Sequence, residues 1–306
     1  MAINLMWAYV RSDMTPWEES IDGNMICKYV SLTTGRYFSD VCSFSNLNED
    51  IADYFKKSDF VVNFCYGLGD MNQVDVAKWF ELKKINHTAP SSLSLALCQD
   101  KHQIPYLAET GGVFSPASVG SDSPSNIKAI AKPRFGARHR GIFTGLIDEI
   151  SNQIDIESDE YVIQEFIDGR EFSVAVIPDS NGYGLDVLEP MEIYSDTHGV
   201  NFFMGQNGVN TERNYCPEIG QSLKAKLLDA ALNVHKISGC HAISRCDFRV
   251  KEDKIYLLEV NAMPNLHPVL SLLPRIAEEC GIDNKEFIRR FLKYVTTTEK
   301  SHVIHI

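Results

Sequence analysis

The sequence predicts an α/β (α+β) protein in which an N-terminal, Rossmann-like parallel sheet is followed by two mixed subdomains. Strands alternate with helices through the first part of the chain, which is typical of a parallel sheet. Strands with period-two alternation then follow one another between residues 127 and 177, and an antiparallel hairpin covers residues 245–261. We therefore expect three units, over residues 1–95, 96–180 and 181–306.

The N-terminal unit is expected to contain a small parallel sheet. Its expected elements are strands near residues 3–10 and 60–64, and helices over residues 16–32 and 72–84. Gly67 and Gly69 follow the second strand, but the third glycine of a dinucleotide-binding fingerprint is missing. These glycines therefore indicate a turn rather than a phosphate-binding loop.

The remaining two units alternate strands with long amphipathic helices. The expected elements are helices over residues 94–110, 222–238 and 284–294, and strands over residues 127–133, 161–167 and 171–177. A polar loop over residues 195–215 contains Gly199, Gly205 and Gly208, which permit large backbone changes. That loop is a candidate lid over a reaction centre.

The hairpin carries the residues with the clearest chemistry. Side chains two apart in a strand share a face, and residues 251–254 are expected to form the turn. If the hairpin folds about Asp253, Asp247 lies opposite Glu259 and Arg245 opposite Asn261. Two facing carboxylates repel unless a cation lies between them. Hard oxygen ligands at that density suit Mg²⁺. The alternative is the polar face of a half-solvated antiparallel sheet.

Composition limits the possible partners. The 306 residues are 44% hydrophobic and 23% charged, with a formal net charge of −12. This acidic balance argues against general nucleic-acid binding. No apolar run approaches the roughly 20 residues that a membrane helix needs, and the start of the chain lacks the basic region and cleavage site of a signal peptide. We expect a cytoplasmic protein with no nucleic-acid or membrane partner.

The eight cysteines show no CxxC pair. Most lie in apolar segments, and these are Cys27, Cys65, Cys98, Cys240 and Cys246. Such a distribution predicts reduced, buried thiols and no disulfide framework.

Six short motifs occur in an order that resembles the ATP-grasp superfamily and, within it, the D-alanine–D-alanine ligase-like branch. They are Gln99-Asp100-Lys101, Ala131-Lys132-Pro133 with Gly141-Ile142, Gln164 to Glu171, Arg245-Cys246-Asp247-Phe248, Glu259-Val260-Asn261, and Ser271-Leu272-Leu273-Pro274. Each motif alone is modest, and their common order is what makes the resemblance specific. It covers about residues 60–280 and is weak in the first fifty residues.

This resemblance implies an ATP-grasp fold, in which two α+β subdomains sandwich ATP. It also implies an ADP-forming ligase that converts a carboxylate into an acyl phosphate and couples it to an amine. The implied cofactors are ATP and Mg²⁺, with two ions in the site and Mn²⁺ as a substitute. The implied partners are small amino-acid or peptide substrates. Relatives are commonly homodimers, but the sequence does not determine the oligomeric state.

Several residues are expected to bind the nucleotide. Lys132 precedes a loop containing Gly136 and Gly141, where a lysine can meet phosphate and glycines let backbone N–H groups approach it. By resemblance, Lys101 supplies a second cation near the α-phosphate and Glu171 holds the ribose hydroxyls. The segment whose backbone would bind adenine consists of Gln164, Glu165, Phe166 and Ile167.

The resemblance assigns the hairpin to catalysis. Asp247, Glu259 and Asn261 match the magnesium ligands, and Glu259 matches the bridge between two ions. Arg245 matches the arginine that stabilises the transferred phosphoryl group, and with Lys132 it forms the expected catalytic pair.

The chain departs from the D-alanine–D-alanine ligase pattern where substrates bind. Arg134, Arg138 and Arg140 replace small residues and serines, which indicates either an acidic substrate, additional phosphate binding or a solvated basic loop. Arg213 is a candidate replacement for an absent lid lysine, and Glu19, or Glu18, for a substrate-binding glutamate. The expected substrate residues are Arg138, His139, Asn265, His267, Ser271 and Glu19.

These departures predict a ligase that joins other amino acids or peptides, in specialised biosynthesis, rather than a cell-wall enzyme. Three alternatives stay open: a true D-alanine–D-alanine ligase, an intramolecular cyclase that uses the same acyl phosphate, and a nucleotide-binding regulatory module. The complete set of Arg245, Asp247, Glu259 and Asn261 speaks against the last, because binding alone does not require all four.

Overall fold

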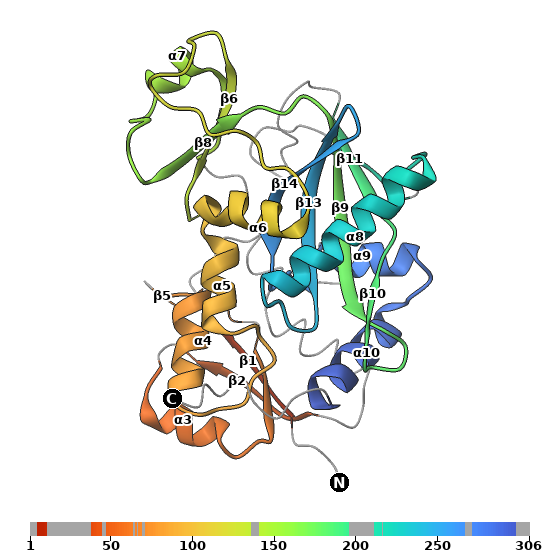
Figure 1. The fold of residues 1–306 in the computed structure, drawn as a ribbon. Coiled ribbons are helices and arrows are strands. Elements are labelled where there is room, and N and C mark those ends of the chain that lie inside the picture. Colours follow the sequence, from red (N-terminus) through yellow and green to blue (C-terminus); the bar gives the residue numbers. More distant parts are fainter. Residues whose placement is uncertain are drawn as a thin grey trace.

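The fold was analysed in a computed structural model of the chain. It describes residues 5–10, 38–44, 47–63, 65, 67–68, 71–135, 141–195, 211–215, 217–266 and 271–297. Strands and helices from all three expected parts of the chain are present (Figure 1). Among the helices of these described ranges, none has both the length and the apolar composition needed to cross a bilayer.

The N-terminal sheet is parallel, as predicted. Its order is β2-β1-β3, formed by Phe38–Phe44, Leu5–Val10 and Phe60–Asn63. Two short strands, β4 (Gly67–Leu68) and β5 (Met71–Asn72), form a separate antiparallel pair. Helices α3 (Glu49–Phe55) and α4 (Gln73–Leu82) contribute Phe55 and Phe80 to a small apolar core. The helix expected over residues 16–32 lies outside the described residues.

One long helix was expected over residues 94–110, and the structure breaks it in two. Helix α5 (Ser92–Gln99) ends at Asp100, a single 3-10 turn η1 (Lys101–Gln103) follows, and α6 (Ile104–Gly111) continues. Asp100 has extended backbone angles, and its carboxylate accepts the His102 N–H at 3.0 Å. The Asp100 side chain therefore caps the N-terminus of the η1 turn, which is the usual effect of aspartate at a helix N-terminus.

A small sheet stands apart from the rest of the molecule at the upper left of Figure 1. Its antiparallel order is β7-β6-β8, and helix α7 packs beside it. The elements are β6 (Lys128–Pro133), β7 (Phe143–Leu146), α7 (Ile147–Ser151) and β8 (Tyr161–Glu165). We call this unit the lid sheet, which is separate from the candidate lid loop over residues 195–215.

The largest sheet has the order β12-β11-β9-β13-β14, with β10 paired to β9. Its strands are β9 (Arg170–Pro178), β10 (Leu185–Val187), β11 (Met191–Ser195), β12 (Thr211–Asn214), β13 (Ser244–Lys251) and β14 (Lys254–Asn261). Strand β9 is buried along most of its length because it lies at the centre of this sheet. The subdomain boundary expected at residue 180 therefore falls after a strand of the C-terminal sheet, not before it.

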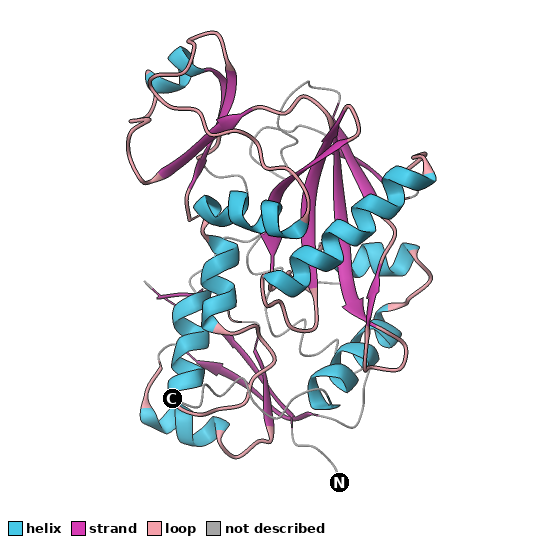
Figure 2. Ribbon diagram, in the orientation of Figure 1, coloured by secondary structure: helices cyan, strands magenta, loops and turns pink. Residues whose placement is uncertain are grey.

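Helices cover the large sheet (Figure 2). Helix α8 (Gln221–Ile237) contacts β9 and β13, and α6 contacts β14. On the C-terminal side, α9 (Leu272–Glu279) and α10 (Asn284–Thr297) complete the main apolar core, to which α10 contributes Phe287 and Phe291. The sheet that carries the hairpin is therefore held rigid by packing on its surface.

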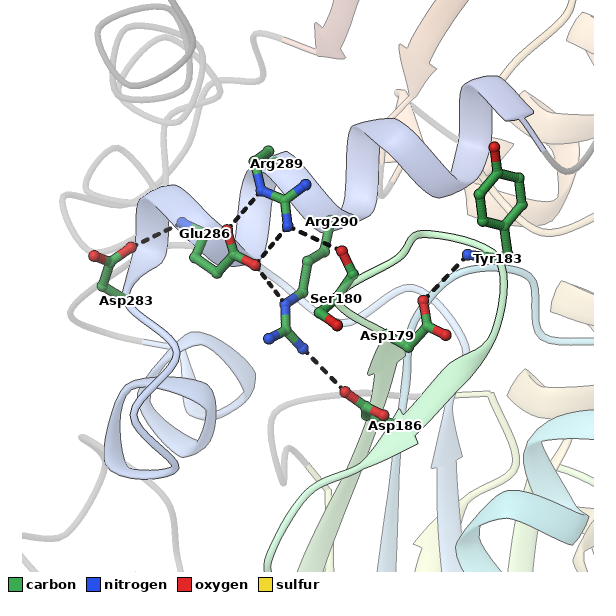
Figure 3. A network of polar contacts seen from close by, with 8 residues as sticks. All are labelled: Asp179, Ser180, Tyr183, Asp186, Asp283, Glu286, Arg289 and Arg290. Carbon is green, nitrogen blue, oxygen red and sulfur yellow. Dashed lines mark hydrogen bonds and ion pairs between the residues drawn. The ribbon is translucent and has the colours of Figure 1, made fainter.

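An ion-pair network attaches α10 to the β9–β10 turn (Figure 3). Glu286 accepts hydrogen bonds from Arg289 at 2.6 Å and from Arg290 at 2.9 Å. Arg290 also donates to Asp186 at 3.0 Å, and Arg289 to the Ser180 carbonyl at 3.1 Å. Chiefly because of the Arg289 hydrogen bonds, the pKa of Glu286 is lowered to about 2.

The prediction for the cysteines agrees with the part of the chain that the structure describes. Cys65, Cys98, Cys240 and Cys246 are buried free thiols. Cys27 lies outside the described residues.

Candidate active site

The hairpin has the predicted register. Asp247 pairs with Glu259 and Arg245 with Asn261 in the antiparallel ladder of β13 and β14. A two-residue turn closes it, with φ of 49° at Glu252 and 63° at Asp253. Positive φ at both central residues is what the twist of a tight hairpin favours. A register shift after Asp247, which was not predicted, separates the turn from the polar pairs.

The polar face of the hairpin is a connected network centred on Asp247. Its carboxylate accepts hydrogen bonds from Arg245 Nε at 3.0 Å and Nη2 at 2.8 Å, and from Asn261 Nδ2 at 3.2 Å. Ser173 on β9 donates to the same carboxylate. Burial alone would lower the pKa of Arg245, but the carboxylates of Asp247 and Glu259 raise it above its ordinary value. Arg245 is therefore held both charged and aligned.

The donor set of the hairpin fits Mg²⁺. Within the described ranges, no group of three or more histidine, cysteine, aspartate or glutamate side chains comes together. The hairpin instead offers two facing carboxylates, Asp247 and Glu259, beside the amide of Asn261. Such a set is too small for a cation cage made by protein alone, but it suits an ion completed by phosphate oxygens and water. A cation bound at Asp247 would compete with Arg245 for the same oxygens.

Lys132 and Lys101 are brought together near Glu259. Lys132 lies near the end of β6 and is only 9% exposed. Burial, partly offset by the charge of Glu259, lowers its pKa to about 8. Burial also lowers the pKa of Lys101, and Glu259 again acts against that shift. Two desolvated ammonium groups that both feel one carboxylate make this region suited to anions, because charges interact strongly where water is excluded.

The structure gives Arg134 a partner within the chain, so this residue does not support the expected acidic substrate. Its guanidinium forms a bidentate pair with Asp100, at 2.8 Å and 2.7 Å, and this pair lowers the pKa of Asp100. The Lys101 N–H donates to the Arg134 carbonyl at 3.3 Å. Arg134 therefore ties the η1 turn to the end of β6, and so links the segments that carry Lys101 and Lys132.

The expected adenine segment begins in the last strand of the lid sheet and continues beyond it. Gln164 is buried in β8, and Glu165 ends that strand. The Glu165 N–H donates to the Ala117 carbonyl at 2.8 Å, and the Phe166 N–H to the Lys128 carbonyl at 2.9 Å. Any adenine contact from this segment is therefore left to its other backbone groups.

Glu171, the expected ribose ligand, is paired with a residue that sequence reasoning missed. Arg249 lies directly opposite Glu171 in the β13–β9 ladder and donates to its Oε2 from Nε at 3.1 Å and from Nη2 at 2.8 Å. The sequence held a signal for Arg249, because residues 245, 247 and 249 alternate along one strand and so place Arg249 on the same face as Arg245 and Asp247. Gly169, before Glu171, is required because a Cβ there would lie 2.3 Å from the Val250 carbonyl oxygen.

The substrate residues are only partly described. Ser271 donates to Asn265 Oδ1 at 2.7 Å, immediately before α9. On β12, burial lowers the pKa of Arg213, and neighbouring Tyr215 partly compensates this shift. The expected residues that lie outside the described ranges are Glu19, Arg138, His139 and His267.

Comparison with known proteins supports the family resemblance that the motifs indicated. The family model of the D-ala D-ala ligase C-terminus matches residues 146–293, which include the hairpin and Glu171. Over these residues the chain is similar to the D-alanine–D-alanine ligase branch of the ATP-grasp family. This family forms carbon–nitrogen bonds between an acid and an amino acid and releases ADP.

Relatives with this architecture match nearly the whole chain. It is 27% identical to the D-alanine–D-alanine ligase of Pelagibacter ubique, over 81% of this chain and 84% of the relative. The D-alanine–D-alanine ligase of Bacillus anthracis superposes with a TM-score of 0.76 at 19% identity, covering 97% of this chain and 98% of that one; its ATP complex gives 0.73. A D-Ala:D-Ser ligase of Enterococcus faecalis, VanG, gives 0.74 at 18% identity, over 96% and 100%.

These comparisons confirm the predicted fold class and the predicted class of ATP-dependent, amide-forming ligase. They do not support the prediction of specialised biosynthesis, and the alternative of a D-alanine–D-alanine ligase is closer to them. The prediction relied on departures in the substrate loops. One of these, Arg134, is engaged by Asp100, and Arg138 and Arg140 lie outside the described residues.

Proposed function

We propose that this chain joins two D-alanine molecules into a dipeptide at the expense of ATP. The observation that carries this proposal is the hairpin, where Asp247 faces Glu259 and accepts hydrogen bonds from Arg245 and Asn261. The buried Lys132 supports it, because the charge of Glu259 acts on this ammonium group. The relatives supply the substrate class, since those matched over most of their length include D-alanine–D-alanine ligases.

The proposed reaction has two steps. A carboxylate oxygen of the first D-alanine attacks the γ-phosphorus of ATP, and the bond to the bridging oxygen breaks, so that an acyl phosphate forms and ADP leaves. The deprotonated amine of the second D-alanine then attacks the acyl carbon. The carbon–oxygen bond to phosphate breaks and the leaving phosphate takes up the proton lost by the attacking nitrogen, so that inorganic phosphate and the dipeptide are released. Such chemistry depends on positioning and charge neutralisation, and requires no protein nucleophile.

In this proposal, the chain's own residues hold charge at defined places. Lys132 and Lys101 attract the phosphates of ATP, and Arg245 stabilises the negative charge of the transferred group. Asp247, Glu259 and Asn261 would hold Mg²⁺, which neutralises phosphate charge when bound. Glu171 binds the ribose hydroxyls, and the loops around Asn265 and Ser271 border the amino-acid site.

Asn265 also differs from the D-alanine–D-alanine ligase pattern, and this difference is compatible with the proposed function. The family pattern has a glycine there whose backbone N–H takes part in the oxyanion site, and asparagine has the same backbone group. The Asn265 side chain instead accepts a hydrogen bond from Ser271 at 2.7 Å. It therefore helps to anchor the loop to the start of α9.

The test is a substrate-dependence measurement. The purified chain is mixed with Mg-ATP and D-alanine, and ADP is followed by a coupled assay while the product is weighed by mass spectrometry. We expect one ADP per D-alanyl-D-alanine and none with L-alanine. Turnover only with other amino-acid pairs would overturn the D-alanine assignment. ADP release with one substrate that cyclises would favour the cyclase, and no release from a broad pool would favour a regulatory module.

A further inference from the structure

Arg249 connects the parts of the expected nucleotide pocket that are far apart in the sequence. Its guanidinium donates to Glu171 Oε2 through Nε and Nη2, and to the Ile167 carbonyl through Nη1 at 2.8 Å. Its Cζ lies 4.7 Å from the centre of the Phe166 ring, within the range of a cation–π contact. One side chain therefore contacts both the adenine segment and the ribose carboxylate.

Burial makes these contacts strong and directional. Arg249 is 7% exposed and the Glu171 side chain 14%. A buried arginine must pair fully, and its planar fork fixes the direction of each partner more tightly than lysine can. Both donors to Glu171 use the same oxygen, Oε2. Arg249 therefore holds one oxygen of the Glu171 carboxylate in place.

We propose that Arg249 is the positioning residue of the purine-nucleoside pocket, and that it gives the site its preference for ribose over deoxyribose. It holds the Glu171 carboxylate in the direction from which a ribose hydroxyl is bound, and it fixes the Ile167 carbonyl beside the adenine segment. The inference rests on the proposed function, because that function supplies the nucleotide.

The chain offers a matched control on the next residue pair of the same sheet. Arg170 forms a bidentate pair with Glu192 at 2.7 Å and 2.8 Å, and lies over the Phe172 ring at 5.1 Å. It makes the same kinds of contact as Arg249, with a side chain that is 45% exposed, and its partners Glu192 and Phe172 are not among the residues expected to bind the nucleotide. Loss of Arg170 therefore reports the structural effect of removing an arginine from this sheet.

The experiment compares ATP with 2′-deoxy-ATP and 3′-deoxy-ATP. The KM and kcat of ADP release, and the nucleotide-dependent shift in Tm, are measured for the wild type, Arg249→Met, Arg249→Lys and Arg170→Met. A hydrogen bond to a charged group contributes roughly 10- to 100-fold, so we expect the wild type to prefer ATP over at least one deoxynucleotide by about 10-fold or more. Arg249→Met should reduce this ratio to about one and raise the KM for ATP, with the KM for D-alanine unchanged.

The two further variants separate positioning from folding. Arg249→Lys keeps the positive charge but cannot donate to Glu171 and to the Ile167 carbonyl at the same time. Its preference for ATP over the deoxynucleotides should therefore lie between that of the wild type and that of Arg249→Met. This variant decides the question if Arg249→Met does not fold. Arg170→Met should keep the wild-type ratio.

The failure of this inference differs from the failure of the proposed function. If the Arg249 variants discriminate between the nucleotides as well as the wild type does, or if Arg170→Met loses discrimination equally, the inference is wrong while ligase activity stands. If the wild type releases no ADP, the ligase proposal fails, and the Tm shifts with ATP and 2′-deoxy-ATP still test Arg249. If the KM, kcat and Tm shift of the wild type are the same for all three nucleotides, both the ribose-binding role of Glu171 and the positioning role of Arg249 are wrong.

Discussion

At the scale of single residues, the expected phosphate site depends on cations that the fold has removed from water. Lys132 is the clearest case, because it is 9% exposed and its pKa falls to about 8. An ammonium group with this pKa is only partly charged just above neutrality, in contrast to an ordinary lysine. Phosphate binding at this site is therefore expected to depend on pH.

The Lys132 prediction concerns the alkaline limb of activity. Above pH 8 the free enzyme loses the Lys132 charge, so kcat/KM for ATP should fall by up to about tenfold per pH unit. Lys132→Arg should abolish this fall, because arginine stays protonated, although its overall activity should be lower. The measurement is a pH profile of kcat/KM for both proteins, and identical alkaline limbs would contradict the assignment.

The same pKa shift has a defined sign for stability. Lys132 binds its proton less tightly in the folded state than in the unfolded state, where the pKa is 10.5. The unfolded chain therefore carries more protons between about pH 8 and 10.5, and this group's contribution makes the free energy of unfolding rise over that interval. Below pH 8 the full cost of the buried charge is present.

At the scale of secondary-structure elements, the site is assembled from segment ends. Lys101 lies in the turn that interrupts the helix expected over residues 94–110, and Lys132 near the end of β6. The Asp100–Arg134 pair joins these two ends. Hinges and ligand contacts commonly fall at such positions, because the backbone there is set by capping rather than by a helical or strand ladder.

Helix α10 gives a prediction at this scale. Since the folded state lowers the pKa of Glu286 to about 2, its stabilising contribution is present above its ordinary pKa of 4.5 and is lost as the pH falls through about 2. Glu286→Gln should lower the free energy of unfolding by about 1 kcal/mol at pH 7, a discounted value for a partly exposed pair, and by almost nothing near pH 2.

Denaturant unfolding at both pH values would check the Glu286 prediction. Glu279→Gln on neighbouring α9 is a suitable control, because Glu279 is exposed. An equal effect of Glu286→Gln at pH 7 and pH 2 would show that the network in Figure 3 does not stabilise α10 through charge.

The sequence predicted elements best where the pattern is local. Period-two alternation correctly placed Asp247 and Glu259 on one polar face. The two-residue turn alone would pair Asp247 with Leu258, and the unpredicted register shift after Asp247 produces the observed pairs. The role of Arg249 could not be obtained in this way, because its partner Glu171 is 78 residues earlier in the chain. The helix break at Asp100 was missed because capping by a single aspartate competes with a continuous apolar pattern.

At the scale of the whole molecule, two sheets and one turn supply the residues expected to bind the nucleotide. The large sheet presents the hairpin and Glu171, the lid sheet presents Lys132, and η1 presents Lys101. Substrate specificity was predicted less well, since four of its expected residues, Glu19, Arg138, His139 and His267, lie outside the described ranges. The order of the motifs over about residues 60–280 therefore carried more information than the local departures did.

The central claim is that the hairpin and the two lysines together act on ATP. The most direct test is magnesium-dependent ADP release by the wild type, by Glu259→Gln and by the control Asp253→Asn, which changes a carboxylate at the hairpin turn, where asparagine tolerates the positive φ. We predict a loss of about 10²–10³-fold or more for Glu259→Gln and less than about a twofold change for Asp253→Asn. Undiminished ADP release by Glu259→Gln would contradict the account.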